Sequence, residues 1–202
     1  MVAPDAALTV YTVGHSNHTV ERLLELLAAH DIAAVADVRS SPYSKYAGQF
    51  NRAPLEALVA QAGLTYVYLG EALGGMPNVP GFCDADGHVR YDLIAASDRF
   101  RDGLGSLLEI ARERSVALLC SEEDPGECHR HLLLARVLGE RGVTVLHLRG
   151  DGSVISDADL TATAEFERAG GQQSLFADDG VRPWRSTRSA TPRSQPRSPS
   201  SA

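Results

Sequence analysis

Reactive side chains gather in residues 116–142, VALLCSEEDPGECHRHLLLARVLGERG. The segment begins as an apolar strand over 116–119 and ends as a helix that stops at Gly142. The loop between them contains two cysteines, a run of three consecutive acids, a histidine and an arginine: Cys120, Glu122, Glu123, Asp124, Cys128, His129 and Arg130. Because α/β proteins place ligand sites where a strand passes through such a loop into a helix, we expect a functional site here.

The residue types in this loop indicate acid–base or nucleophilic chemistry. Cys128 precedes the predicted helix, whose unpaired N–H groups stabilise a thiolate, and His129 and Arg130 would lower its pKa further. Glu122 or Glu123 is suited to general acid or base catalysis because a closed cleft raises the pKa of a carboxylate. Arg130 at the helix start would hold an anion. Cys120 ends an apolar strand and could equally be a small buried hydrophobic residue.

An alternation of strands and helices must position these residues. Apolar runs predict strands over 8–13, 33–38, 65–69, 116–119 and 143–148, and helices over 20–30, 55–62, 97–114, the segment before Gly142, and 157–169. The long stretch 70–90, rich in glycine and proline, is predicted to be irregular. The pattern indicates an α/β fold: one domain over 8–169 with a doubly wound, mostly parallel five-stranded sheet and helices on both faces.

The ends of the predicted strands bring further polar residues to the same edge of the sheet. His15 follows the first strand, and Asp37 and Arg39 flank the end of the second. An arginine held by an aspartate and directed into a cleft is suited to binding carboxylate or phosphate, with Ser40 adding a hydroxyl. With the strand order 3-2-1-4-5, His15 and Cys120 would face each other; a flavodoxin-like order would pair strands one and three instead. The alternatives without a functional role are an ordinary turn at Gly14-His15-Ser16 and a structural salt bridge between Asp37 and Arg39.

Known phosphate and metal signatures are absent at the required spacing. The chain has neither GxxxxGK[ST] nor GxGxxG after a strand, and no cysteine is followed by an arginine at the phosphatase spacing. A zinc site from Cys120, Cys128 and His129, with His15, is an alternative. However, adjacent Cys128 and His129 are expected to point in different directions, and the usual C-x₂₋₄-C spacing is missing. We therefore predict no metal, and no cofactor is required by the sequence.

Four blocks resemble a known family. They are TVGHS (12–16), DVRSSPYS (37–44), YLGEALGG (68–75) and LLCSEEDPGECHR (118–130), and together they are similar to domain-of-unknown-function family 488 from about Thr9 to Leu148. The resemblance carries over onto ten residues: His15, Ser16, Asp37, Arg39, Ser40, Cys120, Glu122, Cys128, His129 and Arg130. It implies a site at these positions and leaves the reaction open.

Composition is that of an ordinary globular protein, 44% hydrophobic and 22% charged. No apolar run is long enough to span a bilayer, and the N-terminus lacks the features of a signal peptide. Three cysteines without a disulfide spacing predict free thiols and a cytoplasmic location. The net charge of −7 includes five arginines within 181–202, which leaves −12 on residues 1–180. Such an acidic body is unsuited to gripping a nucleic-acid backbone over a wide face.

The C-terminal region, 170–202, is predicted to be a flexible tail that is disordered from Val181 onward. Its segment Gln172-Gln173-Ser174-Leu175-Phe176 is similar to the peptide by which bacterial repair and replication proteins bind the DNA sliding clamp. Leu175 and Phe176 would fill an apolar pocket while Gln172 makes polar contacts. The alternative is that Leu175 and Phe176 pack back on the domain. The arginine-rich end could add weak nucleic-acid contact.

The leading hypothesis is an enzyme, a hydrolase or transferase, that acts on an anionic, nucleotide or nucleic-acid-derived substrate and is linked to DNA repair or replication through the clamp. Arg39 and Arg130 would hold the anion, Glu122 would handle protons, and His15 or Cys128 would act as acid, base or nucleophile, with His129 beside them. The alternatives are a non-catalytic nucleotide- or metabolite-binding module, and a cysteine–histidine metal or redox protein. Convergence of His15, Arg39, Glu122 and Arg130 in one cleft would favour the enzyme.

Overall fold

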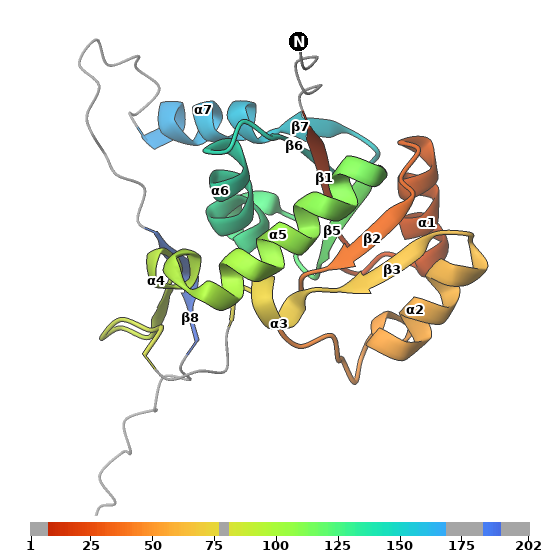
Figure 1. Ribbon diagram of the computed structural model, residues 1–202, viewed down its shortest axis with the longest axis horizontal. Helices are drawn as coiled ribbons and strands as arrows, with labels where there is room; N and C mark the ends of the chain where they lie inside the picture. Colours follow the sequence, from red (N-terminus) through yellow and green to blue (C-terminus); the bar gives the residue numbers. More distant parts are fainter. Residues whose placement is uncertain (1–7, 77–80, 169–183, 191–202) are drawn as a thin grey trace, which may run out of the picture.

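The structure is a computed structural model that describes residues 8–76, 81–168 and 184–190, and a six-stranded sheet lies at its centre (Figure 1). The strands are β1 (Thr9–Gly14), β2 (Ala34–Asp37), β3 (Thr65–Tyr68), β5 (Val116–Cys120), β6 (Thr144–Leu148) and β7 (Val154–Ser156). The first five are parallel to their neighbours, whereas β7 pairs antiparallel with β6. The predicted mostly parallel α/β sheet is confirmed, and β7 is a short strand that the prediction lacked.

The strand order, β3-β2-β5-β1-β6-β7, differs from both orders considered from the sequence. In the predicted order 3-2-1-4-5 the fourth and fifth strands correspond to β5 and β6, and β2 and β1 are side by side. In the structure β5 lies between β2 and β1. All five residues of β5 are buried, which suits a central strand covered on both faces. The predicted proximity of β1 and β5 nevertheless holds, because Gly14 is the register partner of Cys120.

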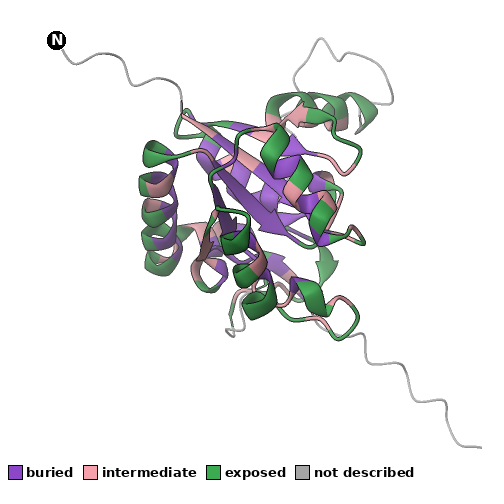
Figure 2. Cartoon of the chain, turned by 90° about the vertical axis from the view of Figure 1, so that its right-hand side faces the viewer, coloured by how far each residue is buried: buried purple, intermediate pink, exposed green. Residues whose placement is uncertain are grey.

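Helices cover both faces of the sheet, as the doubly wound prediction requires. Helices α1 (Val20–Ala29) and α2 (Arg52–Gln61) pack on one face, and α5 (Asp98–Glu113), the π-helical segment Arg130–Ala135 and α6 (Arg136–Gly139) pack on the other. Successive β5 side chains point to opposite faces, so Leu119 belongs to the first core and Leu118 to the second. In Figure 2 the central strands are buried while the outward sides of the helices are exposed.

Helix boundaries follow local signals closely. The Thr19 hydroxyl accepts a 3.2 Å hydrogen bond from Arg22 N, as the predicted N-cap of α1 should. Ser97 caps α5 in the same way through Phe100 N. Helix α7 (Asp157–Arg168) also lies where it was predicted. Helix α2 begins three residues before its predicted start at Leu55.

The described parts of the stretch 70–90, residues 70–76 and 81–90, contain more regular structure than predicted. They contain the short helix α3 (Gly70–Leu73) and the strand β4 (His88–Arg90), and helix α4 (Tyr91–Ala96) follows directly. Helix α3 packs against α5 at Gly103, where an added Cβ would lie 2.5 Å from the Cβ of Ala72. The irregular prediction was wrong here because tertiary packing, which local composition does not report, orders these short elements.

Part of the segment predicted to be disordered also has regular structure. Strand β8 (Arg185–Ser189) pairs antiparallel with β4, and the buried Ser186 hydroxyl accepts a 2.9 Å hydrogen bond from Val89 N. Trp184 packs against the second core, with the Arg136 guanidinium 4.1 Å from its ring centroid. The clamp-like segment 172–176 lies outside the described residues.

Within the described part of the chain, no helix combines the length and the apolar character needed to cross a membrane.

Candidate functional site

The ends of β1 and β5 run together past the last paired residues of the sheet. His15 N donates to Cys120 O at 2.9 Å, and Ser16 N donates to Ser121 O at 2.8 Å. The loop after β5 then folds directly over Gly14, where an added Cβ would lie 1.7 Å from the carbonyl oxygen of Glu122. Only glycine therefore permits this crossing, which brings Glu122 over the sheet edge.

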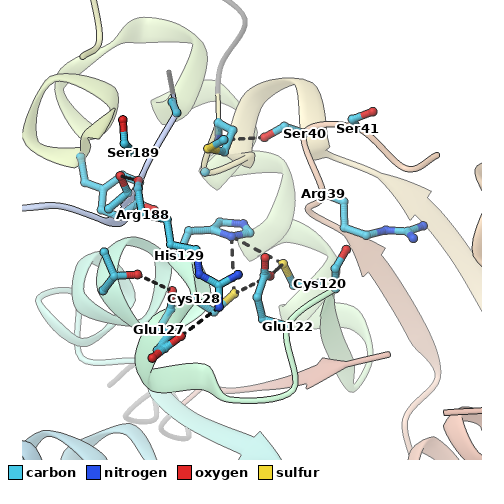
Figure 3. Close-up of a pocket in the computed structure, with 17 residues that line it drawn as sticks. Arg39, Ser40, Ser41, Cys120, Glu122, Glu127, Cys128, His129, Arg188 and Ser189 are labelled. Carbon is cyan, nitrogen blue, oxygen red and sulfur yellow. Dashed lines mark hydrogen bonds and ion pairs between the residues drawn. The ribbon is translucent and has the colours of Figure 1, made fainter. Parts of the chain in front are cut away.

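Two sulfurs, an imidazole and a carboxylate meet in this loop (Figure 3). The Cys120 thiol donates a 2.8 Å hydrogen bond to Glu122 Oε2, and Cys128 Sγ lies 3.4 Å from the same oxygen. His129 Nδ1 is 3.6 Å from each sulfur. The four residues thus form one cluster, which we call the Cys–His–Glu cluster.

The side chains of Cys128 and His129 converge because the backbone changes conformation between them. Cys128 is extended (φ −106°, ψ 150°), whereas His129 is already helical (φ −60°, ψ −17°). The expectation that these neighbours point in different directions was therefore wrong. Gly75 packs against the imidazole, since a Cβ there would lie 2.5 Å from the Cβ and Cγ of His129.

The two thiols differ in their electrostatic surroundings. Burial alone raises the pKa of Cys128, but the hydrogen bond from Cys120 and the nearby His129 and Arg130 lower it well below the usual value. For Cys120, the hydrogen bond to Cys128 and burial raise the pKa of the thiol. The negative charge therefore belongs on Cys128, as predicted from its place before a helix, where Arg130 N lies 3.5 Å from Sγ.

Arg130 supports the cluster from behind. Its side chain is fully buried, and it donates to the carbonyl oxygens of Glu122 (2.5 Å) and Glu123 (3.2 Å) and to the Thr12 hydroxyl (3.2 Å). Its Nε lies 3.3 Å from Cys128 Sγ. This placement favours a role in holding the loop and the thiolate over the predicted contact with a bound anion.

A cavity of about 800 Å³ opens in front of the cluster. It is lined by Arg39, Ser40, Ser41, Gly75, Met76, Tyr91, Cys120, Ser121, Glu122, Glu127, Cys128, His129 and residues 186–190. Six of the ten residues carried over from the family motifs thus line the cavity. The other four, His15, Ser16, Asp37 and Arg130, do not line it. Of the four residues expected to converge, Arg39 and Glu122 line the cavity, His15 contacts Arg39, and Arg130 contacts the loop.

Arg39 belongs to a second buried group beside the cavity. Its guanidinium donates to both carboxylate oxygens of Asp37, at 2.9 and 2.5 Å, and its Nη1 lies 3.2 Å from His15 Nε2. Tyr66 donates a further 2.6 Å hydrogen bond to Asp37. Figure 3 shows the guanidinium directed away from the cysteines. The predicted Asp37–Arg39 pair is confirmed, but its position favours holding the strand end together.

His15 is buried in this second group, stacked on Phe50 with ring centroids 4.2 Å apart. Burial and the Arg39 charge lower the pKa of His15 to about 4, so the imidazole is neutral near pH 7. The side chain does not reach the cavity, which favours a structural role over the predicted acid–base one.

Several residues of the site escaped sequence reasoning. Ser186, Thr187, Arg188 and Ser189 of β8 form one wall of the cavity, although their segment has the composition of a disordered tail. Buried Tyr91 lines it as well. The composition of 185–189, two arginines among serines and a threonine, is at most weak evidence for a strand.

A buried polar network extends from Arg130 away from the cavity. The Thr12 hydroxyl, which accepts from Arg130, lies 2.7 Å from His147 Nδ1, and His147 Nε2 lies 3.1 Å from Asp157 Oδ1. His131 Nδ1 lies 2.5 Å from the same Asp157 oxygen. His131, His147 and Asp157 each offer one atom that could bind a metal ion, and these three atoms are within 4.8 Å of one another. This group could not be predicted from local sequence patterns, because Thr12, His131, His147 and Asp157 come from separate parts of the chain.

We expect replacement of Asp157 by asparagine to lower the free energy of unfolding by about 2 kcal/mol at about pH 5. Burial opposes ionisation, but hydrogen bonds from His131 and His147 lower the pKa of Asp157 from 3.8 to about 2. The stabilisation is therefore complete above the unfolded value and should disappear as pH falls from 3.8 towards 2. Urea denaturation at stepped pH measures the difference. Exposed Asp102→Asn serves as the control, and a difference independent of pH would contradict the assignment.

Comparison with known proteins identifies the family. No curated protein matches the chain. A family model described as "Domain of unknown function DUF488" matches residues 19–137, more than half of the 202 residues. The match includes Asp37, Arg39, Ser40 and the whole Cys–His–Glu cluster, whereas His15 and Ser16 precede it. The chain therefore belongs to the DUF488 family, as its sequence motifs indicated.

Proposed function

We propose that the protein is an enzyme that acts on a small anionic substrate bound in the cavity in front of the Cys–His–Glu cluster. One observation carries this proposal: Glu122 Oε2 lies 2.8 and 3.4 Å from two sulfurs at a point where the cluster borders about 800 Å³ of open space. Groups that can exchange protons and attack electrophiles are thus accessible to a ligand.

Glu122 is the residue we assign to proton transfer. It is only partly buried and lines the cavity, and its hydrogen bond from Cys120 orients the carboxylate. It can accept a proton from an attacking nucleophile and return it to a leaving group. These steps are those of a hydrolase or a transferase. A module that only binds a metabolite would not need ionisable groups so close to two sulfurs, which favours the enzyme over that alternative.

The anionic character of the substrate follows from other residues that line the cavity. Ser40, Ser41, Ser121, Thr187 and Ser189 contribute hydroxyl-bearing residues, and Arg188 contributes a guanidinium. Arg188 is 75% exposed and pairs with Glu127 at 3.1 Å at the rim, so an incoming anion can compete for it. Hydroxyls and one arginine suit a phosphorylated or carboxylated compound such as a nucleotide. In this proposal Arg188 takes the anion-binding role that the sequence suggested for Arg39 and Arg130.

Replacing Glu122 by glutamine should reduce turnover by about 100-fold or more, because the amide cannot exchange the proton. The melting temperature should stay close to that of the wild type, since the amide oxygen can still accept the Cys120 hydrogen bond. Incubation with panels of nucleotides and other phosphorylated or carboxylated metabolites, followed by mass spectrometry, identifies the substrate and measures turnover.

The matched control is Glu113→Gln, a change on the exposed end of α5 that should leave turnover unaltered. A folded Glu122→Gln protein with full activity would remove Glu122 from the mechanism. If the wild-type protein binds a panel compound without converting it, the non-catalytic binding module becomes the better description.

The link to DNA repair or replication is a separate proposal that depends on the clamp-like peptide at Gln172, Leu175 and Phe176. Those residues lie outside the described part of the chain, so the sequence pattern alone supports it. In this scheme the peptide recruits the enzyme to DNA. Because the body of the protein is acidic, it does not grip the DNA backbone, and the cavity selects a small or locally exposed nucleotide.

A further inference from the structure

The Cys–His–Glu cluster has the donor geometry of a tetrahedral metal site. Cys120 Sγ, Cys128 Sγ and His129 Nδ1 lie within 4.8 Å of one another, and Nδ1 is 3.6 Å from each sulfur. Sulfur and nitrogen ligands on a tetrahedral zinc ion, at bond lengths of about 2.3 and 2.1 Å, are separated by about 3.6 Å. These separations would let one ion contact both sulfurs and the imidazole once Cys120 loses the proton that it donates to Glu122.

The imidazole is fixed in the tautomer that a metal requires. His129 Nε2 lies 3.1 Å from the carbonyl oxygen of Val38, which can only accept a hydrogen bond, so Nε2 carries the proton. In the neutral imidazole Nδ1 is then the nitrogen with the lone pair, and it faces the two sulfurs. A backbone carbonyl bound to the second ring nitrogen is the usual outer partner of a metal-ligating histidine.

The charges around the cluster also balance with a divalent cation. Two thiolates neutralise a 2+ ion, and the fully buried Arg130 and the Glu122 carboxylate neutralise each other. Arg130 further supplies N–H groups at 3.3 and 3.5 Å from Cys128 Sγ. Hydrogen bonds of this kind stabilise a metal-bound thiolate and hold it in place.

We propose that Cys120, Cys128 and His129 bind a zinc ion whose fourth position is open to the cavity. Two sulfurs and one nitrogen form a soft donor set, which selects zinc over magnesium or calcium. Three protein ligands with one open position are typical of catalytic rather than structural zinc. Glu122 remains beside the site as the proton carrier, because its Oε2 is only 2.8 Å from Cys120 Sγ, closer than two ligands of one ion usually lie.

The catalytic role of this zinc site rests on the proposed function. A water molecule on the open position gives a proton to Glu122, and the resulting hydroxide forms a bond to the electrophilic atom of the substrate. The bond to the leaving group then breaks, and Glu122 returns the proton to that group. The reaction is a hydrolysis without change of oxidation state, so no further reactant is needed.

Zinc content of the full-length protein tests the site. Protein purified without chelators and reconstituted with zinc should contain about one zinc per chain by elemental analysis. Cys120→Ser, Cys128→Ser and His129→Gln should each lose stoichiometric zinc. Cys83→Ser is the matched control, because Cys83 is the exposed free cysteine outside the cluster, and it should retain the ion.

A measurement on the wild-type protein avoids variants that fail to fold. Reconstitution with Co²⁺ should give the absorption spectrum of tetrahedral cobalt with thiolate ligands, and bound metal should protect two of the three thiols from a thiol reagent. Wild-type protein that takes up no stoichiometric metal, with all three thiols reactive or with a Cys120–Cys128 disulfide, would overturn the zinc site.

The two proposals fail in different ways. If Glu122→Gln binds zinc and stays fully active, the assigned proton transfer is wrong while the zinc site stands. If the wild type converts a substrate without metal and Glu122→Gln does not, the enzyme stands and the zinc site is wrong.

Discussion

Replacing Arg130 by methionine should lower the free energy of unfolding by about 4 kcal/mol. Methionine fills similar space but leaves the carbonyl oxygens of Glu122 and Glu123 and the hydroxyl of Thr12 without their charged donor. Each lost hydrogen bond to a charged group contributes about 1.5–3 kcal/mol, and relaxation of the loop recovers part of the total. The cost is large because Arg130 is fully buried, so water cannot replace the missing donors without rearrangement.

A conservative series distinguishes charge from shape at this position. Arg130→Lys keeps the charge but cannot reach three separate acceptors with one ammonium group, so it should recover less than half of the loss. Urea denaturation at neutral pH measures all variants, with exposed Arg141→Met as the control for loss of an arginine. An Arg130→Met protein within about 1 kcal/mol of the wild type would show that the buried guanidinium is not what holds this loop.

The reactive centre could be predicted because it depends on topology alone. In a parallel sheet the carboxyl ends of all strands lie at one edge, so Cys120, the last residue of β5, was expected to lie near the ends of β1 and β2. The same argument correctly placed Arg39 and Ser40 at the cavity. It could not decide which way each side chain points, and Arg39 turns towards Asp37 instead of the cysteines.

The remaining errors come from information that is not local. The strand order depends on long-range packing, and an apolar run alone does not distinguish β5 from β2, because every residue of both strands is buried. Strand β8 forms because β4 provides an edge, although the composition of 181–202 indicates disorder. The convergence of Cys128 and His129 depends on backbone torsions at a single junction. The spacing rule for zinc sites expects two cysteines separated by two to four residues, so it did not indicate that Cys120, Cys128 and His129 converge.

Arg130 connects the cavity to the buried group formed by His131, His147 and Asp157. From Cys128 the contacts pass through Arg130 and Thr12 to His147 and then to Asp157. Because the Thr12 hydroxyl accepts from Arg130, its own proton is available to His147 Nδ1, and His147 then donates from Nε2 to Asp157. The network thus has a defined direction, and it fixes the guanidinium that supports the thiolate.

Replacing Gly14 by alanine should destabilise the protein by more than about 4 kcal/mol, a large share of the roughly 5–15 kcal/mol that stabilises an ordinary domain. The new Cβ would lie 1.7 Å from the carbonyl oxygen of Glu122, 2.6 Å from its carbonyl carbon and 3.0 Å from the Cα of Glu123. All three atoms belong to the backbone, so no side-chain rotation can relieve the contact. Either the β1–β5 pairing or the loop that carries Glu122 must move.

Gly139→Ala is the matched control, because no atom lies within 4 Å of the added Cβ in helix α6. Alanine there should be neutral or stabilise the protein by up to about 1 kcal/mol, since it is the better helix former. Yield of folded protein and the melting temperature measured by circular dichroism compare the two. Where Gly14→Ala does fold, displacement of the loop should remove metal binding and activity together. Equal stability of the two variants would mean that the loop after β5 does not cross over Gly14 and that Glu122 is held elsewhere.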